Sequence, residues 1–273
     1  MIGAILGDLV GSIYENENTR SYDFPLFTRF SRFTDDTVLT VAIADAILHR
    51  ESARFRWLQP HHNRHMYALR LKAYGRRYPQ AGYGQQFQHW LQSDSLRGYG
   101  SFGNGAAMRV GAIGYAFDQL KTVLREARWS AVVTHNHVQG VKGAQAVAGA
   151  VFLARTGTSK AGIRDWVENR FGYNLHQNVE ALRQTYTFDS SCQGSVPQAF
   201  IAFFESRDYE DAIRKAVSIG GDSDTIACMC GAIAHAYYRH IPAAMLFEYQ
   251  VRIPADLQQV VDQFNDRFGI AFP

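Results

Sequence analysis

The sequence predicts an all-α fold in which a compact set of helices is joined by glycine-rich connections. Apolar side chains recur at intervals of three and four residues along most of the chain, whereas the alternating pattern of a half-buried strand is scarce. Small residues also recur every four positions at Gly3, Gly7 and Gly11, which favours helices that approach one another closely. We therefore expect residues 1–273 to form a single domain.

Two helices have the clearest periodicity. The first begins at Asp35, and its apolar residues from Val38 to Ala46 follow the spacing of a helix that faces a core. The second follows Asp224 and runs from 226 to 238. In chain order, further helical patterns occupy 63–77, 106–117, 119–133, 139–155, 160–170, 196–217 and 255–267.

The composition excludes several classes of protein. The chain has 273 residues, 47% hydrophobic content and a net charge of +3, so it lacks the dense basic stripe of a dedicated duplex nucleic-acid binder. No run of 18 apolar residues occurs and the start lacks a basic leader, so we expect a cytoplasmic protein without a membrane segment. Its three cysteines have no metal-ligand spacing and are expected to be buried thiols. No long apolar repeat suggests self-association, so a monomer is expected.

Two acidic clusters stand where helical patterns begin, at Thr34-Asp35-Asp36-Thr37 and Asp222-Ser223-Asp224-Thr225. Carboxylate and hydroxyl oxygens are the ligands that Mg²⁺, Mn²⁺ and Ca²⁺ prefer. If the clusters converge in the fold, their like charges repel, and a pair of divalent ions is the natural counter-charge. Helix capping is the alternative explanation, because Asp, Ser and Thr are favoured at helix starts. Capping requires only one such residue, however, and each cluster has more.

A glycine-rich segment, residues 100–109, supplies a second signal. Such a segment before a helix can offer backbone amides to phosphate oxygens, although an ordinary loop has the same composition. Phe102 is interpreted either as a stacking surface for a base or as a buried anchor. Thr134-His135-Asn136-His137 forms a third polar island, with a capping or ligand-orienting role as the simplest interpretation.

These motifs together resemble the ADP-ribosylglycohydrolase superfamily, which includes the dinitrogenase-reductase-activating glycohydrolases and the ADP-ribosyl-acceptor hydrolases. The resemblance covers nearly the whole chain. Its motifs are G-D-x-x-G-S-x-Y-E at 7–15, F-T-D-D-T at 33–37, S-F-G-N-G-x-A-M-R at 101–109, T-H-N-H at 134–137 and G-G-D-S-D-T at 220–225. It implies an orthogonal multi-helix bundle, two Mg²⁺ or Mn²⁺ ions, and cleavage of a glycosidic bond at ADP-ribose.

The resemblance also assigns roles to residues of this chain. It implies an acidic residue on a mobile loop beside the metals at Glu15. A carboxylate near the metals is expected to activate water or to protonate the leaving acceptor, and the candidates are Glu15, Asp35 and Asp36. The implied metal ligands are Thr34, Asp35, Asp36, Asp222, Asp224 and Thr225, and the implied substrate-binding residues are Gly100, Ser101, Phe102, Gly103, Asn104, Gly105, Met108 and His135. One departure is visible: similar bacterial members read His-Asn-His-Pro-Glu-Gly, and this chain has Val138 and Gln139 before Gly140. Any role for a carboxylate there is therefore in doubt.

The resulting hypothesis is a metal-dependent hydrolase that releases ADP-ribose from an ADP-ribosylated protein or another ADP-ribosylated acceptor. The alternatives are an ADP-ribose-binding module without turnover, a dinuclear phosphohydrolase, and a non-catalytic member like the related lens crystallins. The last would be expected to have lost metal ligands, and all six matching positions here carry oxygen donors. We expect loops 16–32 and 185–195 to form the outer mouth of the site, where the acceptor binds.

Overall fold

The computed structural model describes residues 1–50 and 62–270, and these residues form fourteen α-helices with no β-strand beyond one isolated bridge. The predicted all-α fold is confirmed. The helices are α1 (Ile2–Gly11), α2 (Asp35–Leu48), α3 (His62–Arg77), α4 (Gln85–Gln92), α5 (Gly111–Ala116), α6 (Leu120–Ala131), α7 (Val138–Arg155), α8 (Lys160–Phe171), α9 (Val179–Thr185), α10 (Cys192–Glu205), α11 (Tyr209–Ser218), α12 (Ser223–Tyr238), α13 (Ala243–Arg252) and α14 (Ala255–Phe268).

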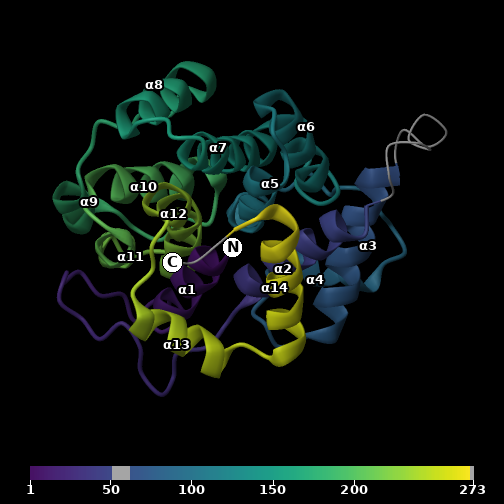
Figure 1. Ribbon diagram of the computed structural model, residues 1–273, viewed down its shortest axis with the longest axis horizontal. Helices are drawn as coiled ribbons and strands as arrows, with labels where there is room; N and C mark the ends of the chain where they lie inside the picture. Colours follow the sequence, from purple (N-terminus) through teal and green to yellow (C-terminus); the bar gives the residue numbers. More distant parts are fainter. Residues whose placement is uncertain (51–61, 271–273) are drawn as a thin grey trace.

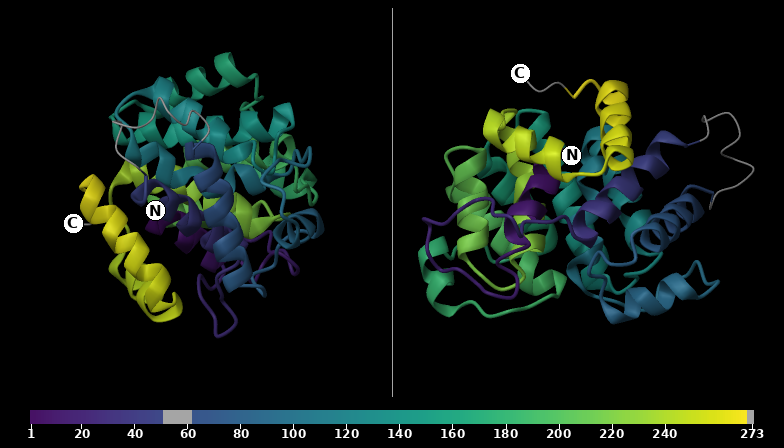
Figure 2. Two further views of the ribbon diagram at one scale, coloured as in Figure 1. Left: turned by 90° about the vertical axis from the view of Figure 1, so that its right-hand side faces the viewer. Right: turned by 90° about the horizontal axis from the view of Figure 1, so that it is seen from below.

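Two apolar helices, α1 and α12, lie at the centre of the molecule (Figure 1). Every residue of α1 is buried, and so is α12 from Ser223 to Ala236, as expected for helices that are apolar on all sides. Helices α7, α10 and α11 pack against α12, and α2 packs against α1, α3 and α14. The long connection from α1 to α2 runs along the outside of the molecule, and α13 and α14 form an outer pair (Figure 2).

The contact between α1 and α12 depends on glycine. A Cβ atom on Gly7 would lie 2.1 Å from the carbonyl oxygen of Ala227, and one on Gly11 would lie 2.4 Å from Cα of Asp224. Because both obstacles are backbone atoms, neither can rotate out of the way. The four-residue glycine spacing therefore lets two backbones touch, and this contact brings Asp8 of α1 to the start of α12.

Most predicted helices are confirmed within a few residues: α2, α3, α6, α7, α8, α12 and α14. The single helix predicted over 196–217 is wrong, because the chain is extended at Ser206 and Asp208 before α11 begins. The Asp208 side chain accepts a hydrogen bond from the amide of Asp211 (2.8 Å), so a helix cap interrupts the continuous apolar pattern. The pattern at 106–117 also divides, into two 3₁₀ turns, Asn104–Ala106 and Met108–Val110, followed by the short α5.

The cysteine prediction is confirmed, since Cys192, Cys228 and Cys230 are free and buried. The thiol of Cys228 points to the carbonyl of Met108 and that of Cys230 to the carbonyl of Ala212, on different faces of α12. Among the helices of the described residues, none has both the length and the apolar character needed to cross a membrane.

A Gly7→Ala substitution is expected to lower the free energy of unfolding by about 3 kcal/mol, at the upper end of the cost of overpacking a core. The reason is the 2.1 Å approach to a backbone oxygen that repacking of side chains cannot relieve. Urea unfolding in EDTA measures the change. Gly84→Ala is the control, because a Cβ there meets no atom within 4 Å. Equal unfolding midpoints for the two variants would contradict this account of the contact.

Candidate functional site

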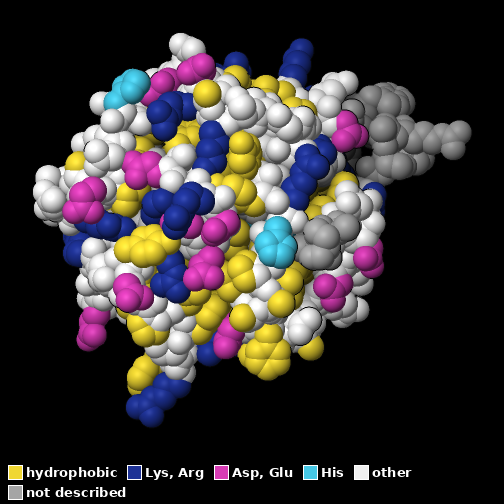
Figure 3. Space-filling model, turned by 60° about the vertical axis from the view of Figure 1, so that its left-hand side comes forward, with side chains coloured by type: hydrophobic (Ala, Val, Ile, Leu, Met, Phe, Trp, Pro, Cys, Tyr) yellow, Lys and Arg dark blue, Asp and Glu magenta, His cyan; other side chains and the backbone are white. Residues whose placement is uncertain are grey.

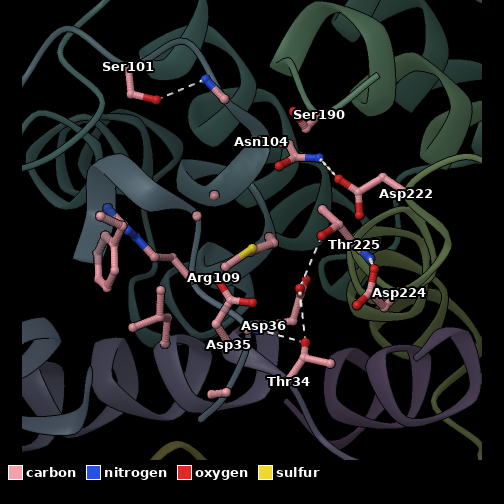
Figure 4. Close-up of a pocket in the computed structure, with 18 of the residues that line it drawn as sticks. Thr34, Asp35, Asp36, Ser101, Asn104, Arg109, Ser190, Asp222, Asp224 and Thr225 are labelled. Atoms are coloured by element: carbon pink, nitrogen blue, oxygen red, sulfur yellow. Dashed lines mark hydrogen bonds between the residues drawn. The ribbon is translucent and has the colours of Figure 1, made fainter. Parts of the chain in front are cut away.

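A cavity of about 460 Å³ lies where the N-termini of α2 and α12 meet, a volume typical of small-molecule sites. Figure 4 shows Thr34, Asp35 and Asp36 on one side of it and Asp222, Asp224 and Thr225 facing them, with Asn104 above. The structure thus brings the two predicted acidic clusters together. The predicted residues that line the cavity are Glu15, Thr34, Asp35, Asp36, Ser101, Gly103, Asn104, Gly105, Met108, His135, Asp222, Asp224 and Thr225.

The carboxylates form two groups of three that share Asp224. Asp8, Asp36 and Asp224 make one group, and Glu15, Asp222 and Asp224 make the other; within each group the candidate ligand oxygens lie within 4.8 Å of one another. Asp35 lies outside both groups and lines the cavity beside them. Such all-oxygen sets of donors fit a hard divalent cation.

Asp8 is a site residue that the sequence analysis did not select. Its carboxylate is fully buried and accepts hydrogen bonds from the backbone amides of Thr34 (2.9 Å) and Thr37 (3.1 Å), and from both threonine hydroxyls. Asp8 therefore secures the first turn of α2 as well as facing Asp36 and Asp224. The signal available in the sequence is an aspartate between Gly7 and Gly11 in an otherwise apolar helix.

Helix capping accounts for only part of the two clusters. Thr34 does cap α2, because its hydroxyl accepts a hydrogen bond from the amide of Asp36 (3.3 Å). At the start of α12, by contrast, Asp222 makes no side-chain cap, and its Oδ2 accepts a hydrogen bond from Nδ2 of Asn104 (2.7 Å). The hydroxyl of Thr225 donates to Oδ2 of Asp36 (3.0 Å), which links the two clusters directly.

Burial and mutual repulsion make these carboxylates hard to ionise. Burial raises the pKa of Asp8 to about 6, and burial together with the charges of Asp8 and Asp222 raises the pKa of Asp35 to about 8. The same causes raise the pKa of Asp36 and Asp224 well above the usual range, and burial and Asp222 raise that of Glu15. Oδ1 of Asp36 is also buried without a hydrogen-bond partner among the described residues. A cation would satisfy both the charge and this unpaired oxygen.

The glycine-rich loop is tied to residues 190–192 by backbone hydrogen bonds. The amide of Asn104 donates to the carbonyl of Ser190 (2.8 Å), and the amide of Cys192 donates to the carbonyl of Phe102 (2.9 Å). The amides of Gly100 and Gly103 are also used, by Asn136 Oδ1 (2.6 Å) and Ser101 Oγ (3.2 Å). These three amides, of Gly100, Gly103 and Asn104, are therefore not free for phosphate.

Gly100 and Phe102 are the two predicted substrate-binding residues that do not line the cavity. Phe102 is 50% exposed and its ring centroid lies 5.6 Å from that of His137, so the interpretation of Phe102 as a buried anchor is wrong. The cavity also has walls that the sequence analysis did not select: Arg109, and a segment from Ala81 to Phe87 at the start of α4. Both loops expected at the mouth line the cavity: loop 16–32 contributes Arg32, and loop 185–195 contributes Phe188 and Ser190.

His135 forms the wall beside the loop glycines. A Cβ atom on Gly105 would lie 3.2 Å from Nε2 of His135, so the ring packs directly against the loop. Burial and the nearby Arg109 charge lower the pKa of His135 well below its usual value, so the ring is neutral near neutral pH. The site therefore combines an acidic centre with a loop wall that carries a neutral imidazole.

The chain is similar to several known proteins. A family model described as ADP-ribosylglycohydrolase matches residues 1–271. The chain is similar to ADP-ribosylhydrolase ARH3 of Mus musculus (28% identity over 87% of this chain and 82% of that protein) and of Homo sapiens (28%, 87% and 84%). An uncharacterized protein of Archaeoglobus fulgidus is 30% identical over 78% of this chain and 74% of its own length.

A solved structure described as an ADP-ribosylglycohydrolase-related protein complex has the same fold, with a TM-score of 0.63 at 22% identity, and the match covers 98% of this chain and 96% of that chain. Together with the family model that spans residues 1–271, these matches show that the chain belongs to the ADP-ribosylglycohydrolase family.

Proposed function

We propose that this protein is a metal-dependent hydrolase that cleaves the N- or O-glycosidic bond between ADP-ribose and an acceptor and releases ADP-ribose. The observation that carries the proposal is the convergence of two three-carboxylate groups at one cavity whose opposite wall is a glycine-rich loop. Family membership supports the hydrolytic activity. The metal requirement and the bond type are our inference from the site.

Two Mg²⁺ or Mn²⁺ ions fit the donors present. Asp8, Asp36 and Asp224 would hold one ion and Glu15, Asp222 and Asp224 the other, with Thr34, Asp35 and Thr225 as further oxygen donors. When bound, such a metal pair binds ribose hydroxyls as a Lewis acid and lowers the pKa of water. The side-chain amide of Asn104 donates a hydrogen bond to Asp222, and this bond fixes the position of the loop relative to the acidic centre.

Glu15 is the carboxylate that we assign to proton transfer. It is half-buried at the cavity wall, and its carboxylate accepts no hydrogen bond from the described residues, so the oxygen that does not hold the ion is available to transfer a proton to the leaving acceptor. Asp35, which lies outside both carboxylate groups, is the second candidate. Asp36 is less suited, because one of its oxygens is held by Thr225 and the other is buried.

The acceptor is proposed to be an ADP-ribosylated protein or another ADP-ribosylated molecule rather than duplex nucleic acid. On the face shown in Figure 3, Lys and Arg side chains are interspersed with Asp and Glu and do not form a basic stripe. The net charge of +3 agrees with this picture.

A panel of ADP-ribosylated acceptors, joined through arginine, serine, a nucleic-acid base or an acetyl-type ester, tests the proposal. The pure protein is incubated with each, with Mg²⁺ or Mn²⁺ and with EDTA, and the products are separated. Release of free ADP-ribose only with metal is expected. Release of AMP would indicate a phosphohydrolase, and ADP-ribose binding without any product would indicate a binding module.

Asp224→Asn is expected to remove most of the metal-induced rise in Tm and to reduce hydrolysis at least 100-fold, because Asp224 belongs to both carboxylate groups. In EDTA the variant should be at least as stable as the wild type, since it removes a buried carboxyl whose ionisation is opposed by burial and by its acidic neighbours. Calorimetric metal titration and thermal unfolding measure metal affinity and stability, and the release of ADP-ribose from an acceptor measures hydrolysis. Asp262→Asn, an exposed change on α14, is the control. Wild-type metal affinity in Asp224→Asn would refute the shared-ligand assignment.

The metal-free protein is expected to become less stable as pH rises from about 4 to about 8. Asp8 and Asp35, with pKa values of about 6 and about 8, keep protons in the folded state that the unfolded chain has already released. The folded state therefore binds more protons, and its stability falls as pH rises through these values. Metal competes with those protons, so Mg²⁺ should raise Tm more at pH 8 than at pH 6. An equal metal effect at both values would count against ionisation of these carboxylates on binding.

Gly105→Val is expected to weaken ADP-ribose binding by at least tenfold, because even its Cβ would lie 3.2 Å from Nε2 of His135 and the full side chain must displace that ring. The metal-induced rise in Tm should be unchanged, since Gly105 contacts no carboxylate. Calorimetric titration with ADP-ribose in saturating Mg²⁺ gives the affinity. A folded variant with unchanged affinity would mean that the loop is only a connector.

A further inference from the structure

Arg109, Thr134 and His135 form a series of hydrogen bonds at the cavity wall that ends at the imidazole of His135. Arg109, which is fully buried, donates from Nη2 to Oγ1 of Thr134 (2.7 Å) and to the carbonyl of Ser130 (2.8 Å). Oγ1 of Thr134 lies in turn 2.7 Å from Nδ1 of His135. The series thus runs from a charged guanidinium, through one hydroxyl, to an imidazole that lines the cavity.

The charge of Arg109 determines which atom donates and which accepts in each of these hydrogen bonds. Burial lowers the pKa of Arg109 to about 10, so the guanidinium remains charged at neutral pH, and within the described residues it forms no ion pair with a carboxylate. A hydroxyl that accepts a hydrogen bond from a guanidinium becomes a stronger donor and a weaker acceptor. The other acceptor within reach of the Thr134 hydroxyl, the carbonyl of Ala131, is 3.4 Å away. The hydroxyl proton is therefore directed to Nδ1 of His135.

A neutral imidazole that accepts at Nδ1 carries its proton on Nε2. Nε2 faces the loop: Cβ atoms built on Gly105 and Gly103 would lie 3.2 Å and 3.6 Å from it. Both glycines and His135 line the cavity. A proton on Nε2 presents a donor to an oxygen of a ligand at the loop, whereas the opposite tautomer would present a lone pair and repel an anionic oxygen.

We propose that Arg109 and Thr134 are positioning residues that hold His135 as the Nε2–H tautomer, so that its ring donates a hydrogen bond to an anionic oxygen of the ligand beside Gly103 and Gly105. This inference rests on the proposed function, and it takes a diphosphate oxygen of ADP-ribose as the acceptor. Neither positioning residue needs to contact the ligand; both act through the imidazole.

The tautomer is measured directly by ¹⁵N chemical shifts of the histidine rings in the ligand-free protein near pH 7. His135→Gln identifies the His135 signals among the ten histidines of the chain. The expected result is an unprotonated Nδ1 and a protonated Nε2. A proton on Nδ1, or a fully protonated ring at pH 7, would overturn the proposal.

Matched substitutions at Thr134 test the link to the ligand. Thr134→Val keeps the shape and removes the hydroxyl, and Thr134→Ser keeps the hydroxyl. We expect Thr134→Val to raise the Kd for ADP-ribose about tenfold and to leave the Tm rise with Mg²⁺ unchanged, as expected for loss of one buried hydrogen bond. Thr134→Ser should retain the wild-type tautomer and affinity. Ser130→Ala is the control, because it removes a buried hydroxyl of α6 that, among the described residues, bonds to the carbonyl of Ala127 alone.

Wild-type affinity in a folded Thr134→Val protein would overturn the positioning role. If Thr134→Val does not fold, the wild-type ¹⁵N spectrum and the Kd of Thr134→Ser decide the question. The proposed function fails separately: a wild-type protein that cleaves no ADP-ribosyl acceptor but shows the Nε2–H tautomer refutes the hydrolase assignment and leaves the tautomer assignment intact.

Discussion

The backbone contact between α1 and α12 is the constraint on which the site depends. Gly7 and Gly11 let the two helices approach until a single Cβ would overlap a backbone atom of the partner helix. The same contact places Asp8 and Asp224 within one group of oxygen ligands, although they are separated by most of the chain. The contact between α1 and α12 therefore also fixes the positions of Asp8 and Asp224. A substitution that separates the two helices moves these carboxylates apart.

Without a cation, the acidic centre lowers the stability of the folded protein, because it buries several carboxylates beside one another. Its carboxylates are buried or half-buried, their pKa values are raised, and Oδ1 of Asp36 has no partner among the described residues. Hydrogen bonds from the first turn of α2 compensate Asp8, and Asn104 and Thr225 compensate Asp222 and Asp36. These bonds leave negative charge uncompensated, and the divalent cation that we propose would supply the missing counter-charge.

The opposite wall of the cavity is organised by hydrogen bonds rather than by charge. Residues 102–104 are paired with 190–192 through the backbone, and this pairing holds Asn104 against Asp222. On the far side of the loop, Arg109 and Thr134 support His135. The loop is thus held between the acidic centre and the buried guanidinium of Arg109, so the cavity has one face of carboxylates and another that carries a neutral imidazole.

The sequence by itself determined the helical fold, the positions of seven of the fourteen described helices and the residue types of the two acidic clusters, because helical periodicity and short polar motifs are local properties of the chain. It did not reveal the break at Ser206, where one cap outweighs a continuous apolar pattern. Only the tertiary structure showed that Asp8 faces Asp224, that three loop amides are already engaged, and that Arg109 stands behind His135. Each of these depends on contacts between segments distant in the chain, and such contacts leave no periodic trace in the sequence.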